Sequence, residues 1–178
     1  MRTSAEYPSC AAHFVEATSD MSDSCKTSYE SRYAIRFGAR LGIGRDGEVY
    51  STDHNTAVKF LTVREHFERE RNVYEVCVRK AIRKVAGHAV PDFFRADDEL
   101  LAIEMEIVRP PFLLDFVSAY PIATAPEFSE EVWEQWYAEK SEQFGDHWPQ
   151  VELVLAEFNR LTGYVLLDVN PGNIRFPA

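Results

Sequence analysis

Apolar and polar residues alternate in several short stretches of the first half of the chain, which is the pattern of half-buried strands. Two of these stretches, residues 33–42 (YAIRFGARLG) and 47–52 (GEVYST), are predicted to pair across a glycine-rich turn, and residues 55–61 (NTAVKFL) to form a third strand. Residues 90–96 (VPDFFRA) and 100–108 (LLAIEMEIV) predict a further pair joined by a DDE turn. The pattern therefore favours an antiparallel sheet.

Apolar residues that recur every three or four positions predict a long helix over residues 63–85. Gly87 lies just beyond this segment, where a glycine is expected to cap the helix. A second stripe of the same period predicts a helix that ends at Gly163. The members of this stripe are Val151, Val154, Leu155, Phe158 and Leu161.

The remaining segments of the second half predict a mixture of helix and strand. Residues 112–120 (FLLDFVSAY) predict a short helix, and the aromatic segment around Trp133 and Trp136 predicts another. The final stretch, residues 164–176 (YVLLDVNPGNIRF), predicts a strand, a turn at NPG and a second short strand. Taken with the sheet, these elements place the chain in the α+β class.

The chain divides into three regions at the level of sequence. Residues 1–31 are rich in Ser and Thr, short of large aliphatic residues and without periodicity, so we expect a mobile N-terminal tail. Ordered structure is expected to begin near Arg32. Pro110 and Pro111 interrupt the chain and predict a boundary between a first subregion at 32–108 and a second at 109–178.

Composition and charge exclude several classes of function. The 178 residues are 46% hydrophobic, which is enough for the core of one domain, and the formal net charge of −10 argues against a nucleic-acid partner. No apolar run approaches the roughly 18 residues that cross a membrane, and no secretory signal is visible. The scattered Cys10, Cys25 and Cys77 favour a reducing, cytoplasmic setting and, with the histidines, show no zinc-ligand spacing.

Gly42, Gly44, Gly47 and Val49 spell G-x-G-x-x-G-x-V between the first two predicted strands. A dinucleotide site would need a helix directly after these glycines, whereas the following EVYST predicts a strand. The strand–turn–strand context is that of a glycine-rich loop whose backbone N–H groups close over the phosphates of ATP. The alternative is a glycine-rich hairpin that binds no ligand.

Lys59 lies inside the apolar strand AVKF. An isolated lysine in a strand is usually solvated, but this lysine differs if a carboxylate from the predicted helix meets it. Glu70 is three residues after Phe67 and three before Val73, so it lies on the apolar stripe of the predicted helix. A carboxylate in that position also requires a partner. We therefore predict an ion pair between Lys59 and Glu70; the alternative is a Glu70 that reaches solvent.

These motifs resemble those of the protein kinase-like superfamily, and the resemblance covers about residues 32–176. After the glycine loop, Ala57-Val58-Lys59 matches the strand that bears the ATP-binding lysine, and Glu70 matches the helix glutamate. The resemblance implies an antiparallel β N-lobe with one long helix, followed by an abbreviated and mainly helical C-lobe.

Two later segments carry the same resemblance. AIEMEIV is similar to the strand that leads into the hinge, with Met105 at the gatekeeper position and Glu106 to Val108 as the adenine-contacting hinge. DVNPGN is similar to the catalytic loop, because Asp168 and Asn173 keep the D-x-x-x-x-N spacing. The alternative for these two residues is an Asp and an Asn in an ordinary Pro-Gly turn.

The resemblance implies ATP and Mg²⁺ as ligands and assigns a role to each residue. Lys59 would bind the α and β phosphates and Glu70 would orient Lys59. Asp168 would accept the proton of an incoming hydroxyl group, and Asn173, together with Asp168, would hold the magnesium ion.

Three departures from the family pattern bear on activity. Leu166 and Leu167 replace the His-Arg that precedes the catalytic Asp, and Asn170 replaces a lysine near the transferred phosphate. The Asp-Phe-Gly motif, whose Asp is the main magnesium ligand in the family, has no room between Asn173 and the last residue of the sequence. Losing one charge-stabilising group of this kind costs about 10²–10³ in rate.

We therefore expect an atypical ATP-binding phosphotransferase that moves the γ-phosphate to a hydroxyl acceptor. The alternative is a catalytically impaired pseudokinase that acts as a binding or regulatory module, or one half of a split kinase. Apolar residues at 151–161 and at Leu166 and Leu167 also require a cover. That cover is expected to be either the segment 133–148 or a second chain, as a protein partner or a homodimer.

Overall fold

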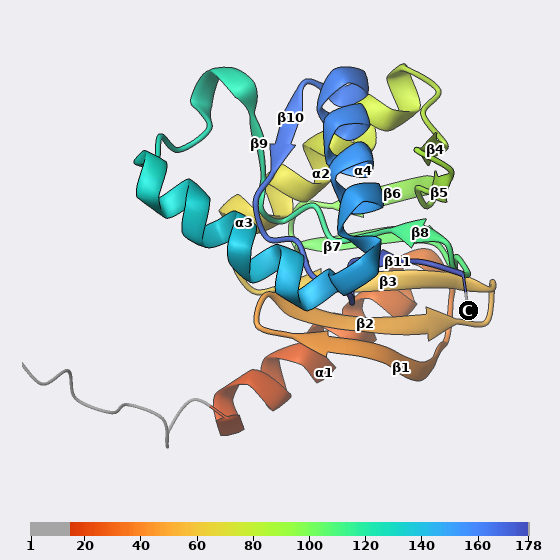
Figure 1. Cartoon of the computed structure of the whole chain (residues 1–178). Coiled ribbons are helices and arrows are strands. Elements are labelled where there is room, and N and C mark those ends of the chain that lie inside the picture. The colour runs from red at the N-terminus through yellow and green to blue at the C-terminus, as the bar shows by residue number, and fades with distance from the viewer. Residues whose placement is uncertain (1–14, 178) are drawn as a thin grey trace, which may run out of the picture.

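The computed structural model describes the backbone of residues 15–177 and the side chains of residues 23–177, and the fold is of the α+β class (Figure 1). The α-helices are α1 (Val15–Tyr33), α2 (Arg64–Arg79), α3 (Glu130–Phe144) and α4 (Trp148–Thr162). The long strands are β1 (Phe37–Gly44), β2 (Gly47–Thr52), β3 (Thr56–Leu61), β6 (Phe93–Asp97) and β7 (Ala102–Glu106). The short elements are β4 (Lys84–Val85), β5 (His88–Ala89), β8 (Phe112–Leu113), β9 (Ala119–Pro121), β10 (Tyr164–Leu166), β11 (Ile174–Arg175) and the single-turn 3₁₀ helices η1 (Ile122–Thr124) and η2 (Gly145–His147).

The long strands form one sheet in the order β1-β2-β3-β7-β6, and every neighbouring pair in it is antiparallel. Both predicted strand pairs and the predicted third strand are therefore confirmed. Two smaller sheets, β10-β9 and β11-β8-β5-β4, tie the second half of the chain together. In the second of these the β5–β8 pair is parallel.

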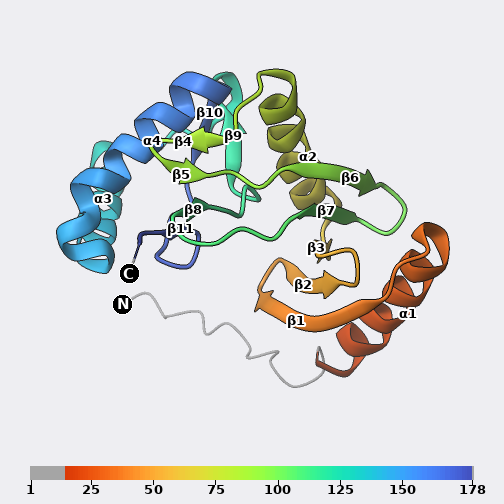
Figure 2. The same ribbon diagram turned by 90° about the vertical axis from the view of Figure 1, so that its right-hand side faces the viewer.

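The five-stranded sheet has a helix on each face, as two views at right angles show (Figures 1 and 2). Successive residues of β3 point to opposite faces. Val58 and Phe60 pack with Tyr29 of α1 in one buried cluster, whereas Ala57 and Leu61 pack with residues of α2 in the other. Lys59 lies between Ala57 and Leu61 in the same alternation, so it is on their face of the sheet and faces α2.

The prediction that ordered structure begins near Arg32 is wrong, because residues 15–31 belong to helix α1. Tyr29 is fully buried and donates a hydrogen bond to Glu104 of β7 at 3.0 Å, and Arg32 pairs with Asp97 at 2.7 Å. A polar helix of this kind is stabilised mainly by contacts with the rest of the fold. Residues 1–14 of the predicted tail lie outside the described residues.

The helix predicted over residues 63–85 is confirmed from Arg64 to Arg79, but its predicted end is wrong, and the helix predicted over residues 112–120 is wrong throughout. Helix α2 ends at Arg79, and residues 84–85 instead pair with β5 in a small hairpin. Gly87, with φ +84°, lies in the turn of that hairpin and caps no helix. Residues 112–120 form β8 and β9 with a loop between them, in which Asp115 has φ +63°. A helix does not accommodate that backbone conformation.

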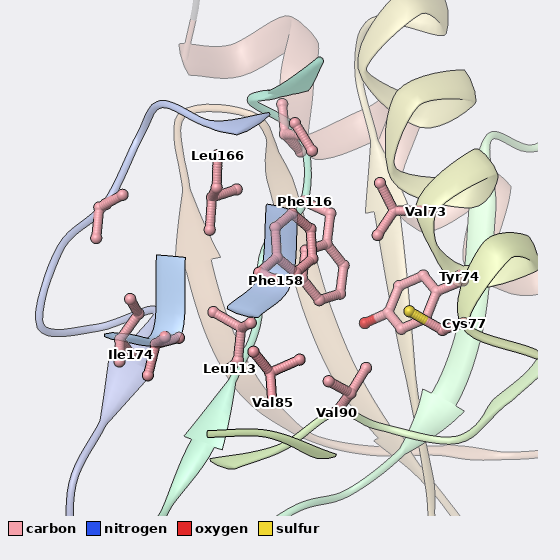
Figure 3. Packing of buried hydrophobic residues seen from close by; sticks show 14 of the residues in the cluster. Val73, Tyr74, Cys77, Val85, Val90, Leu113, Phe116, Phe158, Leu166 and Ile174 are labelled. Atoms are coloured by element: carbon pink, nitrogen blue, oxygen red, sulfur yellow. The ribbon is translucent and has the colours of Figure 1, made fainter. Parts of the chain in front are cut away.

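The predicted helices at 133–137 and 151–161 are confirmed as α3 and α4. Phe158 of α4 stacks on Phe116 with 5.5 Å between ring centroids, and Leu166 is buried in the same core (Figure 3). Trp136 of α3 packs against this core, and its indole N–H donates to the carbonyl of Leu167 at 3.0 Å. The chain therefore covers this core with its own segment 133–148, which was the first of the two expected covers.

No helix in the described part of the chain is both long enough and apolar enough to cross a membrane. Cys25 and Cys77 are free thiols, and Cys10 lies outside the described residues.

Candidate functional site

A cleft of about 990 Å³ lies between the five-stranded sheet and the segments 112–120 and 168–175. The glycine-rich hairpin, β3, α2 and the end of β7 contribute its other walls. Every residue that the sequence proposes for the site lines this one cleft. These residues are Gly42, Gly44, Gly47, Val49, Ala57, Lys59, Glu70, Met105, Glu106, Val108, Asp168 and Asn173.

The predicted ion pair between Lys59 and Glu70 is confirmed. Lys59 lies at the middle of β3, where it pairs with Val49 on one side and Ile103 on the other, and only 8% of it is exposed. Its ammonium Nζ is 2.7 Å from Oε2 of Glu70. A buried ammonium is stable only with such a partner.

Glu70 is held in place by the apolar stripe of α2, on which Phe67 and Val73 are fully buried on either side of it. Burial raises the pKa of Glu70 to about 6, and the positive charge of Lys59 opposes this rise. Burial outweighs the effect of Lys59, so the pKa of the Glu70 carboxyl group is closer to neutral pH than that of an exposed glutamate.

The pH dependence of stability should reveal this shift. Because the folded-state pKa of Glu70 is about 6 against an ordinary 4.5, the folded state holds the extra proton between these two pH values. Protonation of Glu70 therefore stabilises the folded state by about 2 kcal/mol below pH 4.5, and this stabilisation is lost as the pH rises through 6. Urea unfolding at a series of pH values measures this. Between pH 4.5 and 6 the free energy of unfolding should fall more steeply with pH in the wild type than in Glu70→Gln. Parallel plots of this free energy against pH would contradict the raised pKa.

Asp115 is a site residue that the sequence analysis missed. Its Oδ1 lies 3.1 Å from the Nζ of Lys59, on a loop that was predicted to be helical. The same oxygen accepts a weaker hydrogen bond from the N–H of Val117 at 3.4 Å. A detectable signal was present, because Asp115 is the single charged residue in the apolar run FLLDFV, and the reasoning applied to Lys59 applies to it as well.

The three glycines of the hairpin have different structural roles. A Cβ atom at Gly47 would lie 1.9 Å from the carbonyl oxygen of Phe60, so the pairing of β2 with β3 itself requires glycine there. A Cβ atom at Gly42 or Gly44 would meet nothing within 4 Å, and neither residue has a positive φ. Glycine weakens a strand, and the folded chain offers no internal reason for these two. A ligand that approaches the backbone in the cleft would supply one.

This distinction predicts opposite outcomes for two alanine substitutions. Gly47→Ala should lower the free energy of unfolding by about 1–3 kcal/mol or more, because the methyl group collides with the backbone of β3. Gly44→Ala should leave stability unchanged or raise it slightly, while weakening the binding of ATP. Urea unfolding and ATP titration of both variants test this. Unchanged ATP affinity in Gly44→Ala would show that no phosphate approaches that glycine.

Asp168 and Asn173 lie on a turn that is fixed to the loop bearing Asp115. The backbone N–H of Asp168 donates to Oγ of Ser118 at 2.8 Å, and that of Leu114 donates to the carbonyl of Asn173 at 2.8 Å. Asp168 is exposed to the cleft, and among the described residues none hydrogen-bonds to its carboxylate. Its oxygens are therefore available to a ligand.

The side of the cleft formed by the end of β7 and residues 106–108, which were predicted to form a hinge, is mainly apolar. Met105 is buried at the end of β7, where its sulfur accepts a hydrogen bond from the hydroxyl of Tyr74 at 3.1 Å. Val49 and Ala57 line the cleft beside it, and Val108 follows the end of the strand. One region of the cleft is thus apolar and another carries charge, as a pocket for a molecule with an aromatic and an anionic part would require.

In the described part of the chain, no group of three or more His, Cys, Asp or Glu side chains is placed to hold a metal ion by itself. Mg²⁺ is usually bound by one or two carboxylates together with substrate phosphates. The carboxylate of Asp168 and the side-chain oxygen of Asn173 are suited to hold Mg²⁺ together with the phosphates of a bound nucleotide.

Comparison of the sequence with protein-family models and with curated proteins finds no match.

Proposed function

We propose that this chain is an atypical kinase-like protein that binds ATP with Mg²⁺ in the cleft and transfers the γ-phosphate to a hydroxyl acceptor. The observation that carries the proposal is the buried Lys59–Glu70 pair, at 2.7 Å, in a cleft lined by the glycine hairpin. Two glycines of this hairpin, Gly42 and Gly44, have no neighbour within 4 Å of where a Cβ atom would lie. A lysine held by a buried acid is a fixed positive charge, and a fixed positive charge suits a phosphate group.

The proposed orientation of ATP follows from the two regions of the cleft. The adenine would lie against the apolar wall of Val49, Ala57 and Met105, beside the hinge residues Glu106 to Val108. The triphosphate would lie under the glycine hairpin, close to Lys59. Backbone N–H groups at Gly42 and Gly44 would then face phosphate oxygens without interference from a Cβ atom.

The remaining residues would act at the γ-phosphate. Asp168, whose carboxylate is free, would accept the proton of the attacking hydroxyl group. Asn173 and Asp168 would hold Mg²⁺, and the ion would neutralise charge on the phosphates. The chain has no need of a metal site formed by protein groups alone, because the nucleotide supplies the other ligands.

A pseudokinase is the second candidate, and one observation favours it. Asn170 stands where the resemblance leads one to expect a lysine near the transferred phosphate, and its side-chain oxygen accepts a hydrogen bond from the N–H of Gly172 at 2.8 Å. This residue therefore shapes the turn and brings no positive charge to the reaction. A protein of this second kind would bind nucleotide and transfer no phosphate.

Thermal-shift titration with ATP, with and without Mg²⁺, tests the proposal. A shift that requires Mg²⁺ and disappears in Lys59→Met and in Asp168→Asn supports the phosphotransferase. A shift that is independent of metal supports the pseudokinase. No shift under either condition contradicts nucleotide binding altogether.

A further inference from the structure

Lys59 has a second acidic partner, Asp115, and the two acids differ in how firmly they are held. Glu70 is 1% exposed and is enclosed by the stripe of α2. The side chain of Asp115 is 33% exposed, and it lines the open cleft. Both acids line the cleft, but a ligand that approaches Lys59 would reach Asp115 more readily than the almost fully buried Glu70.

We propose that Asp115 makes ATP binding depend on a divalent cation: it is the counter-ion of Lys59 in the empty cleft, and it becomes a ligand of Mg²⁺ when the nucleotide occupies Lys59. This role of Asp115 rests on the proposed nucleotide binding. It also gives the cleft a second metal-holding carboxylate beside Asp168.

The balance of charge at Lys59 favours this role. Lys59 carries one positive charge and contacts two carboxyl groups, at 2.7 and 3.1 Å. A phosphate oxygen that binds Nζ from the cleft would lie beside the carboxylate of Asp115. The two negative charges, on neighbouring ligands of one ammonium group, would repel each other. A divalent cation between them removes the repulsion.

The position of Asp115 beside Asp168 and Asn173 also favours this role. Asp115 lies on a loop that is fixed on both sides to the turn bearing Asp168 and Asn173, by Leu114 to the Asn173 carbonyl and by Ser118 to the Asp168 N–H. These contacts place the oxygen donors of Asp115, Asp168 and Asn173 on one connected unit. Magnesium prefers oxygen donors of this type.

The backbone conformation of Asp115 is also unusual. Asp115 has φ +63°, a conformation that costs free energy for a residue other than glycine, although Asp tolerates it better than most. In this conformation its carboxylate contacts Lys59 of β3. Such a cost is typical of positions where a side chain must be aimed at a ligand.

The test is a calorimetric titration with ATP, in EDTA and in Mg²⁺, of the wild type and Asp115→Asn. The amide keeps the shape and a hydrogen bond to Lys59 but removes the negative charge. In EDTA the variant should bind ATP at least about tenfold more tightly than the wild type, because the repulsion is gone. In Mg²⁺ it should bind at least about tenfold more weakly, because one ligand of the ion has lost its charge.

Asp146→Asn is the matched control, because Asp146 is an exposed residue of η2 outside the cleft and its loss changes the net charge equally. It should leave both affinities unchanged. Mn²⁺ provides a second readout: with a non-hydrolysable ATP analogue, its electron paramagnetic resonance should report less bound metal in Asp115→Asn than in the wild type.

The outcomes separate the two proposals. Suppose that the wild type binds ATP and that the ratio of the affinity in Mg²⁺ to the affinity in EDTA is the same for Asp115→Asn as for the wild type. The proposed role of Asp115 is then wrong, and nucleotide binding stands. If no protein binds ATP under either condition, the proposed function itself is contradicted, and the role of Asp115 with it.

Discussion

Replacing Lys59 with methionine should lower the affinity for ATP by about 10- to 150-fold, as measured by calorimetry in Mg²⁺. Among the residues that the structure describes, Lys59 is the one lysine that is buried and also lines the cleft, and a hydrogen bond to a charged group is worth about 1.5–3 kcal/mol. Lys59→Met should also lower the free energy of unfolding by about 3–5 kcal/mol, because Glu70 remains buried without its partner.

The two effects of Lys59→Met can be separated with a second substitution. In Lys59→Met/Glu70→Leu the unpaired carboxyl group is absent, so most of the lost stability should return while ATP affinity stays low. Lys84→Met, an exposed residue of β4 outside the cleft, controls for loss of charge. Affinity equal to the wild type in either variant that lacks Lys59 would show that the triphosphate binds elsewhere.

The second large effect concerns Asp168. Asp168→Asn should lower the rate of phosphoryl transfer by about 10²–10⁴, the range for a general base, while binding of metal-free ATP remains close to that of the wild type. Release or transfer of radiolabelled γ-phosphate under single-turnover conditions measures the rate. Transfer at the wild-type rate in Asp168→Asn would remove Asp168 from the reaction, and a wild type without transfer would favour the pseudokinase.

Local periodicity was sufficient to predict the strands of the sheet beside the cleft and the part of α2 that bears Glu70. Apolar and polar residues alternate along the strands at 47–52 and 55–61. Because successive residues of a strand point to opposite faces, Lys59 lies on the face opposite to Val58. The spacing of Glu70 from Phe67 and Val73 then identified its partner across 11 positions of sequence. Such predictions succeed because burial imposes the period of the element on the apolar residues.

The elements that depend on distant contacts were not predictable in the same way. Helix α1 has few apolar residues, and the contacts of Tyr29 and Arg32 with β7 and β6 are visible only in three dimensions. Most residues in the run 112–120 are apolar and they show no clear period, because Leu113, Phe116, Val117 and Ala119 are all buried. The apolar spacing therefore did not distinguish helix from strand. Asp115 was missed for that reason.

The error at the end of α2 has a different origin. Ile82 and Val85 continue the helical spacing of the stripe, but they contact the core from a turn and a short strand beyond the helix. Ala81, with φ +54°, marks the change of direction. Apolar spacing alone does not show where the backbone leaves the helix.

The most direct test of the central claim is the structure of the protein with a non-hydrolysable ATP analogue and Mg²⁺. The account predicts a phosphate oxygen within hydrogen-bonding distance of the Nζ of Lys59, the adenine beside Met105 and Val108, and Glu70 still paired with Lys59. An analogue bound outside this cleft, or one bound within it without any phosphate contact to Lys59, would contradict the account.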